Sequence, residues 1–312
     1  MTEYVLVVAG LGGLILGAEL LVRSGTAIAA RLGISPLLIG LTVVSIGTSL
    51  PELAIGIDAT LNDAGPLAVG NIAGTNMVNI LLILGLSAAM LPLALGRQTL
   101  RLDLPVMAVS AVLLLVLCFN GTLSRFDGVL LLAVAIGYTV AAVRGELTSR
   151  TPSTTDDTPD QGPMWQRSAQ LIAGIVIVVI AADWLVDGSV RVATDLGISE
   201  ALIGLTVIAI GTSAPEFVTT VVSTIRGDRD LAIGNLIGSS VYNITFILGT
   251  AALVRPLAIT DDLIHVDIPL MTGVALLCIP VFITGRRVSR LEGIAFVATY
   301  LVYLTLVIAL RT

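Results

Sequence analysis

Apolar runs long enough to cross a bilayer recur along the whole chain. Each covers roughly 18–25 residues, which is the length that a helix needs to span about 30 Å of hydrocarbon. The runs fall at about residues 4–22, 37–57, 67–91, 102–119 and 126–143, and again at about 168–186, 201–223, 231–254, 266–283 and 293–310. The pattern therefore predicts an all-α integral membrane protein with ten transmembrane helices, five in each half.

The two halves repeat one another at an offset of 164 residues. Residues 33–52 align with residues 197–216 without a gap, and 15 of the 20 positions are identical. Such self-similarity indicates an internal duplication. Because each copy has an odd number of spans, the second copy enters the membrane upside down. We therefore expect two inverted five-helix repeats, residues 1–143 and 168–312, joined by a polar, proline-bearing linker at residues 144–167 that has no fold of its own.

Polar positions interrupt the apolar pattern in the second span of each half. They recur at i, i+3, i+4 and i+7, which places them on one face of a helix. The positions are Ser45, Thr48, Ser49 and Glu52 in the first half, and Ala209, Thr212, Ser213 and Glu216 in the second. A carboxylate near the middle of the membrane costs several kcal/mol unless it is compensated, so a functional role is expected for both glutamates. The alternative is a neutral, hydrogen-bonded glutamate that only holds helices together.

A proline precedes each glutamate. Pro51 and Pro215 lack the amide that would bond the carbonyl four residues back, on Gly47 and Gly211. Inside a membrane such a freed carbonyl needs a partner, and a cation is a suitable one. We expect the helix to bend or unwind at the Gly-Thr-Ser before each proline. The competing interpretation is a simple kink.

The next span of each half carries a second polar stripe, with period four. Its members are Asn71, Thr75 and Asn79 in the first half and Asn235, Ser239 and Asn243 in the second. Small and amide residues in membrane helices often serve only to pack neighbouring helices. Because both stripes recur in both halves, we instead expect them to face one another.

Composition supports a membrane protein and excludes a soluble one. Hydrophobic residues make up 56% of the chain, charged residues only 12%, and mean hydropathy is +1.01. The net charge of −6 lies in short loops, and we infer no nucleic-acid partner from it. The two cysteines, Cys118 and Cys278, lie in separate apolar runs and are expected to be buried thiols.

The arginines predict the orientation in the membrane. With the amino terminus outside, 12 arginines fall on the cytoplasmic side, at residues 23, 31, 97, 101, 144, 150, 167, 226, 229, 286, 287 and 290, and 4 fall outside, at 125, 191, 255 and 311. Cytoplasmic loops carry an excess of arginine and lysine. We therefore expect a multi-pass protein of the cell membrane with both termini outside and the linker in the cytoplasm. Inverted repeats are typical of secondary transporters, whose site lies at the repeat interface near mid-membrane.

The two stripes offer carboxylate, hydroxyl, amide and carbonyl oxygens, with no histidine, cysteine or thioether. Such a set suits hard cations, and Ca²⁺ is favoured over Mg²⁺ because it accepts irregular oxygen cages. The charges of two glutamates equal that of one Ca²⁺. No enzyme activity is expected, since neither Ser49 nor Ser213 has a nearby histidine or lysine to act as a base. No cofactor is expected, only transported ions.

The motif pair resembles a known family. Gly-Thr-Ser-x-Pro-Glu on one helix, followed by Gly-Asn-x-x-Gly-[Ser/Thr]-x-x-x-Asn on the next, occurs twice. It is similar to the α-repeats of the sodium/calcium exchanger family within the cation/Ca²⁺ exchanger superfamily, in its compact prokaryotic form. The resemblance implies that helices two, three, seven and eight line the ion sites while long, tilted helices one and six slide past them. It also implies ion ligands at Ser45 and Ala209 through their carbonyls, and at Thr48, Ser49, Glu52, Thr75, Asn79, Thr212, Ser213, Glu216, Ser239 and Asn243.

The resemblance leads to one main functional expectation and one rival. We expect an antiporter that exchanges Na⁺ for Ca²⁺ by alternating access. A Ca²⁺/H⁺ antiporter on the same fold is the alternative, because a glutamate in the membrane can carry a proton as readily as Na⁺. Asparagine rather than aspartate at residues 79 and 243 favours potassium independence. Stoichiometry, affinity, physiological direction and oligomeric state stay open, and a monomer is one of the states allowed.

Overall fold

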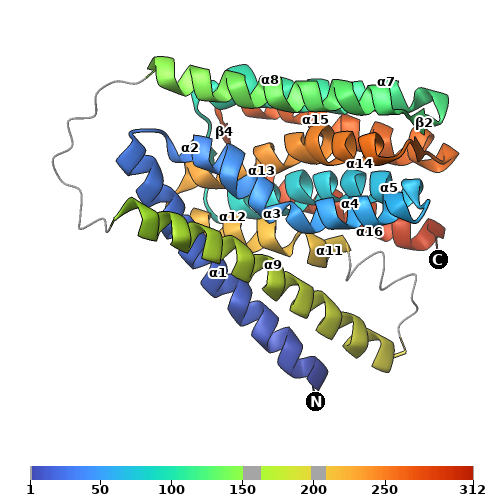
Figure 1. The fold of residues 1–312 in the computed structure, drawn as a ribbon, viewed down its shortest axis with the longest axis horizontal. Coiled ribbons are helices and arrows are strands. Elements are labelled where there is room, and N and C mark those ends of the chain that lie inside the picture. The colour runs from blue at the N-terminus through green and yellow to red at the C-terminus, as the bar shows by residue number, and fades with distance from the viewer. Residues whose placement is uncertain (1, 150–162, 198–208, 312) are drawn as a thin grey trace.

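The computed structural model describes residues 2–149, 163–197 and 209–311, and nearly all of this part is helical (Figure 1). The first half consists of α1 (Thr2–Leu32), α2 (Pro36–Ile39), the π-helical turn η1 (Gly40–Val44), α3 (Ser45–Thr48), α4 (Leu50–Leu61), α5 (Gly65–Met77), the π-helical η2 (Val78–Leu84), α6 (Gly85–Met90), β1 (Leu93–Ala94), the π-helical η3 (Thr99–Asp103), α7 (Leu104–Leu117), the 3₁₀ turn η4 (Cys118–Asn120), β2 (Thr122–Leu123) and α8 (Arg125–Ser149).

The second half repeats this order. It consists of α9 (Met164–Asp195), α11 (Ala209–Thr212), α12 (Ala214–Arg226), α13 (Arg229–Tyr242), the π-helical η6 (Asn243–Ile247), α14 (Leu248–Val254), β3 (Leu257–Ala258), the π-helical η7 (Leu263–Asp267), α15 (Ile268–Ile283), β4 (Arg287–Val288) and α16 (Arg290–Arg311). Helices α5 and α13 begin at residues 65 and 229, and 229 − 65 = 164, the offset of the sequence duplication.

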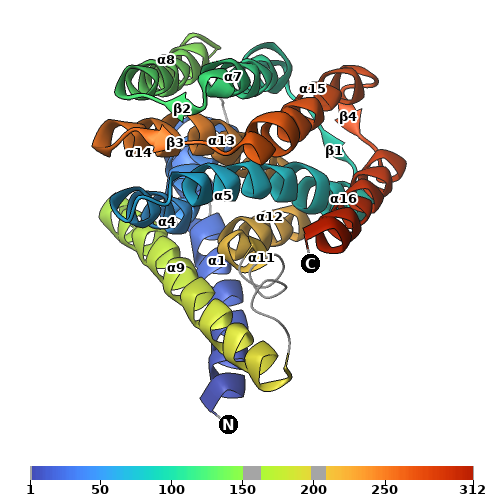
Figure 2. The same cartoon turned by 90° about the vertical axis from the view of Figure 1, so that its right-hand side faces the viewer.

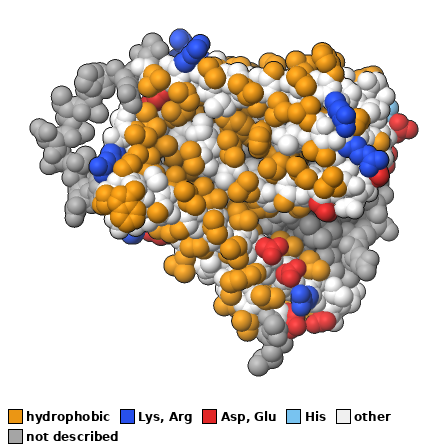
Figure 3. All heavy atoms as spheres, in the orientation of Figure 1, with side chains coloured by type: hydrophobic (Ala, Val, Ile, Leu, Met, Phe, Trp, Pro, Cys, Tyr) orange, Lys and Arg blue, Asp and Glu red, His pale blue; other side chains and the backbone are white. Residues whose placement is uncertain are grey.

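Most of the expected membrane spans are present as helices. Eight helices are long and apolar enough to cross a membrane, and the bent pair Pro36–Thr48 and Leu50–Leu61 makes a ninth among the described residues. The remaining expected span, residues 201–223, lies partly outside the described residues, and its described part is α11 and α12. The prediction of a helical membrane protein is therefore confirmed, while the count of ten and the inversion stay predictions. Hydrophobic side chains cover much of the face seen in Figure 3, as lipid contact requires.

Helices α1 and α9 form a long crossed pair. They have 31 and 32 residues, which at about 1.5 Å per residue gives roughly 47 Å, longer than the hydrocarbon core, so both have to tilt. Figures 1 and 2 show the pair running obliquely to the other helices. Glycines allow the two backbones to approach. A Cβ atom on Gly17 would lie 2.9 Å from the backbone nitrogen of Val178, and one on Gly174 would lie 2.8 Å from that of Leu21.

Two short strand pairs, which the sequence pattern does not predict, join the halves of the chain. Leu93 pairs with Val288 in β1 and β4, and Thr122 pairs with Ala258 in β2 and β3. Both pairs connect loops at the ends of α7 and α15 (Figure 2). A two-residue strand is too short to show an alternating pattern, which explains why the sequence gives no sign of it.

The ends of the chain lie away from the junction of its halves. Helix α8 ends and α9 begins at the left of Figure 1, whereas the ends marked N and C lie farther to the right.

Candidate functional site

The helix that carries each Gly-Thr-Ser motif is broken at its serine. Ser49 separates α3 from α4 with φ −86° and ψ 11°, and Ser213 separates α11 from α12 with nearly the same values, φ −85° and ψ 5°. In the first half, the segments on either side of the break are bent by 44°. The proline two residues after each serine has no amide to continue the helical bonding. The expected local break is therefore confirmed in both halves.

The breaks place two buried carboxylates next to helix ends. Glu52 lies in the first turn of α4 and Glu216 in the first turn of α12, and both side chains are 0% exposed. The hydroxyl of Ser49 donates to Oε1 of Glu216 at 3.0 Å, so the motif of one half contacts the glutamate of the other. The two carboxylates are also close enough for their charges to interact.

Most of the carboxylate oxygens have no partner. Both oxygens of Glu52 and Oε2 of Glu216 accept no hydrogen bond from the described residues, and neither glutamate forms an ion pair with them. Two uncompensated negative charges in a buried site cost several kcal/mol each. The arrangement is therefore suited to hold cations or protons.

Further polar atoms without partners lie at Ser213 and on the helices that follow each glutamate. Within the described part, the Ser213 and Ser239 hydroxyls, Oδ1 of Asn243 and both amide atoms of Asn79 are buried and make no hydrogen bond. A buried polar group left without a partner costs about 1–3 kcal/mol, so a cation bound here would stabilise these groups. Asn79 lies in the π-helical η2 and Asn243 begins the π-helical η6. Turns of this kind occur frequently at functional sites.

The Thr48 hydroxyl links the two halves through Asn235. It contacts Oδ1 of Asn235 at 3.2 Å and also donates to the Ser45 carbonyl at 3.3 Å. That carbonyl already accepts the Ser49 amide at 3.0 Å. For the Ser45 carbonyl to ligate an ion, as the resemblance implies, the Thr48 hydroxyl has to turn away. Thr48 and Ser239 both lie near the Glu216 carboxylate.

The other expected ligands are less directly placed. Thr212 is 6% exposed and Thr75 3% exposed. Thr75 and Asn79 are buried on α5 and η2, but no hydrogen bond among the described residues joins them to either glutamate. Ala209 begins α11, and its side chain lies outside what the structure describes.

Two buried asparagines contact expected ligands although the sequence pattern did not identify them as ligands. Asn235 donates to the Thr220 hydroxyl at 3.1 Å in addition to its contact with Thr48. Asn76 accepts a hydrogen bond from Asn243 at 3.2 Å, which again joins the two halves. Asn235 was visible as part of the second stripe. Asn76 lies one position off that stripe, and its only signal was an amide inside an apolar run.

Glu19 is not part of this site. On α1 it pairs with Arg23 at 2.8 Å and with Arg226 at the end of α12. Its carboxylate is held by these two arginines. Glu19 is therefore explained by ion pairing, and no role in an ion path is needed to explain it.

The donor set of the site is two carboxylates and several neutral oxygens. No cluster of three or more histidine, cysteine, aspartate or glutamate side chains that would hold a metal is found in the described part of the chain. Hard cations that accept mixed oxygen ligands fit such a set best.

Comparisons with known proteins identify the family of this chain. The model of the sodium/calcium exchanger protein family matches residues 2–144 and 168–309. The chain is 33% identical over 307 residues to the putative antiporter CaxA of Alkalimonas amylolytica, with 96% of each protein covered. It is 31% identical over 340 residues to the sodium/calcium exchanger MaX1 of Methanosarcina acetivorans, with 97% of each covered.

Solved structures of the sodium-calcium exchanger NCX_Mj have the same fold. One of them, soaked with Na⁺ without Ca²⁺, superposes with a TM-score of 0.86 at 29% sequence identity and covers 97% of this chain and 98% of its own. On the strength of the family match over both halves, the chain belongs to the sodium/calcium exchanger family of membrane antiporters.

Proposed function

We propose that this protein is a secondary active antiporter that exchanges Na⁺ for Ca²⁺ by alternating access at a site near the middle of the membrane. The observation that carries the proposal is the pair Glu52 and Glu216, both fully buried, with three of their four oxygens free of hydrogen bonds from the described residues. The names of the relative MaX1 and of NCX_Mj support Na⁺ and Ca²⁺ as the ions.

The proposed site uses oxygens from both halves. Its ligands are the two glutamates, the side chains of Thr48, Ser49, Thr75, Asn79, Thr212, Ser213, Ser239 and Asn243, and the carbonyls of Ser45 and Ala209. The contact between Ser49 and Glu216 supports a shared site, because it joins one motif to the other across the interface. With both glutamates ionised, one Ca²⁺ or two Na⁺ neutralises the site. A site that is already neutral gains little from a further cation, so Ca²⁺ and Na⁺ compete for it.

Alternating access requires the site to open to each side in turn. The proposed elements are two inverted repeats, residues 1–143 and 168–312, with residues 144–167 as a cytoplasmic linker and both termini outside the cell. The close contact between α1 and α9 supports a motion of these two helices together against the rest, since a Cβ atom on Gly17 or Gly174 would meet the backbone of the other helix. Such rigid-body motion of one part against the other is typical of transporters built from inverted repeats.

Ca²⁺ flux into everted membrane vesicles tests the proposal. We expect an imposed Na⁺ gradient to drive Ca²⁺ movement and a pH gradient of the same size to leave it unchanged. Vesicles that contain the Glu52→Gln variant serve as the control for transport by other proteins. If only the pH gradient drives Ca²⁺ movement, the protein is a Ca²⁺/H⁺ antiporter and the proposed counter-ion is wrong.

A further inference from the structure

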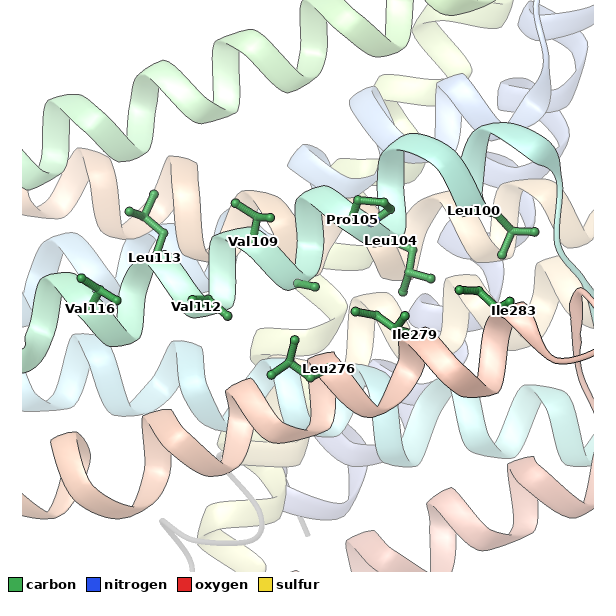
Figure 4. A pocket seen from close by; sticks show the side chains of 11 residues that line it. Leu100, Leu104, Pro105, Val109, Val112, Leu113, Val116, Leu276, Ile279 and Ile283 are labelled. Atoms are coloured by element: carbon green, nitrogen blue, oxygen red, sulfur yellow. The ribbon is translucent and has the colours of Figure 1, made fainter.

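A groove runs along the outer face of the molecule between α7 and α15, away from the glutamates. Its volume is about 520 Å³, and all eleven residues that line it are apolar (Figure 4). Leu104 and Ala108 form a buried floor at 1% and 4% exposure, while Val109, Val116 and Ile283 form an exposed rim. The groove therefore has the shape of a furrow that is open along its length rather than a closed cavity.

The furrow is long enough for a lipid chain. On α7 and the turn before it, the furrow extends from Leu100 to Val116, which is 17 residues, or roughly 24 Å of helix between its two ends. One leaflet of the hydrocarbon core is about 15 Å thick. The furrow is thus longer than one leaflet is thick. An acyl chain that enters from one membrane surface can lie in the furrow along its whole length.

Arginines gather at one end of this furrow. Arg97 and Arg101 lie beside Leu100, and Arg286 and Arg287 follow Ile283 by three and four residues. The two loops are held together, because β1 pairs with β4 and the Leu95 amide donates to the Arg286 carbonyl at 2.9 Å. These four arginines are exposed and form no ion pair with any residue in the described part of the chain.

The opposite end of the furrow has a different charge. At the offset of 164 residues, Arg97 and Arg101 correspond to Asp261 and His265, and the neighbouring residue is Asp262. The duplication therefore repeats the helices but not the basic cluster. The furrow is apolar along its length and basic at one end only, which is the pattern that an anionic lipid matches.

We propose that the furrow between α7 and α15 binds an anionic phospholipid, with one acyl chain along α7 and the phosphate at the arginines. Clusters of basic residues between membrane helices bind anionic headgroups, and each such residue strengthens the interaction about fivefold. A second copy of the chain is a poorer occupant. Around a two-fold axis normal to the membrane, it would bring the same four arginines against one another.

Quenching by brominated lipids tests the proposal. In a Trp165→Phe/Trp184→Phe background, which removes both native tryptophans, Val109→Trp places a reporter on the rim of the furrow. Val302→Trp on α16 is the matched control, because both valines are 60% exposed. Each protein is reconstituted in phosphatidylcholine vesicles with increasing fractions of brominated phosphatidylglycerol, and a parallel series uses brominated phosphatidylcholine.

We expect the furrow reporter to be half-quenched at a phosphatidylglycerol fraction about fivefold or more below that for the control, and both reporters to be quenched equally by phosphatidylcholine. Replacing all four arginines, in Arg97→Gln/Arg101→Gln/Arg286→Gln/Arg287→Gln, should abolish the difference, while Asp261→Asn/Asp262→Asn should preserve it. The proposal is overturned if both reporters respond alike to phosphatidylglycerol. It is equally overturned if neither lipid quenches the furrow reporter, which would mean that another copy of the chain covers it.

Native mass spectrometry of the protein without tryptophan substitutions gives a second measurement. Released from mixed micelles of the two lipids, the wild-type chain should retain phosphatidylglycerol preferentially. This preference should be weaker in Arg97→Gln/Arg101→Gln and lost when Arg286 and Arg287 are replaced by glutamine as well, and retention unchanged in the variant without the four arginines would contradict the proposal.

Discussion

Replacing either buried glutamate by glutamine should separate the charge of the site from its shape. The Glu216→Gln side chain would keep an oxygen that accepts the hydrogen bond from Ser49, which is 3.0 Å in the structure. Glu52 makes no hydrogen bond to the described residues through its carboxylate, so its replacement breaks none there. Neither substitution should harm insertion into the membrane, because each removes a charge from a buried, apolar setting.

The expected effect on Ca²⁺ binding is large. At a separation of about 4 Å and an effective dielectric constant of about 20, a unit charge attracts a divalent ion by about 8 kcal/mol and a monovalent ion by about 4 kcal/mol. The amide dipole of glutamine recovers part of this energy. We therefore expect Ca²⁺ binding to weaken by at least about 4 kcal/mol, or roughly a thousandfold in Kd, and Na⁺ binding to weaken less.

Equilibrium binding of radioactive Ca²⁺ to purified protein measures this change, with thermal unfolding as the check on folding. Asp103→Asn is a matched control, because Asp103 is also 0% exposed and also lies in a membrane helix, but it pairs with Tyr138 at 3.2 Å rather than with the site. The control should bind Ca²⁺ as the wild type does. A Glu52→Gln or Glu216→Gln variant that is folded and binds Ca²⁺ within tenfold of the wild type would refute the assignment of the site.

Topology, helix packing and charge balance each lead to a further prediction. In a variant without native cysteines, single cysteines at residues 150–165 should react with an impermeant reagent only from the cytoplasm and those at residues 62–65 only from outside; labelling of the linker in intact cells would reverse the proposed orientation. Gly17→Leu should destabilise the protein by about 1–3 kcal/mol or block transport, because its Cβ meets the Val178 backbone at 2.9 Å, whereas Gly12→Leu, with no described atom within 4 Å, should behave as wild type in thermal unfolding and flux. Two Na⁺ would balance the two glutamates, but the family resemblance favours three Na⁺ for each Ca²⁺, and we therefore expect electrogenic exchange. Clamping the potential with valinomycin should then shift the Ca²⁺ equilibrium by about 2.3 kcal/mol per 100 mV for each charge moved, and no shift would indicate a neutral two-for-one exchange.

The sequence predicts local features of this protein well. The breaks at Ser49 and Ser213 follow from the proline two residues later, since the missing amide acts within one helical turn. The burial of Glu52 and Glu216 was likewise expected from their place inside apolar runs. These predictions depend only on neighbours along the chain.

The sequence pattern does not predict which side chains make contact between the halves. The stripes indicated that two helix faces meet, but not that Ser49 bonds Glu216 or that Asn76 bonds Asn243. Such pairs depend on the axial offset between packed helices, and a helix shifted by one turn would present other side chains. The π-helical turns at Asn79 and Asn243 were missed for a related reason, because they add a residue to a turn without changing the apolar pattern.

Na⁺-driven Ca²⁺ accumulation by the purified protein tests the central claim most directly. Proteoliposomes are loaded with Na⁺, diluted into Na⁺-free medium that contains radioactive Ca²⁺, and held at equal pH on both sides. Proteoliposomes with wild-type protein should accumulate Ca²⁺ until the Na⁺ gradient has dissipated, and those with the Glu216→Gln variant should accumulate none. Equal Ca²⁺ entry with and without the Na⁺ gradient, or accumulation by the Glu216→Gln variant, would contradict Na⁺/Ca²⁺ exchange at this site.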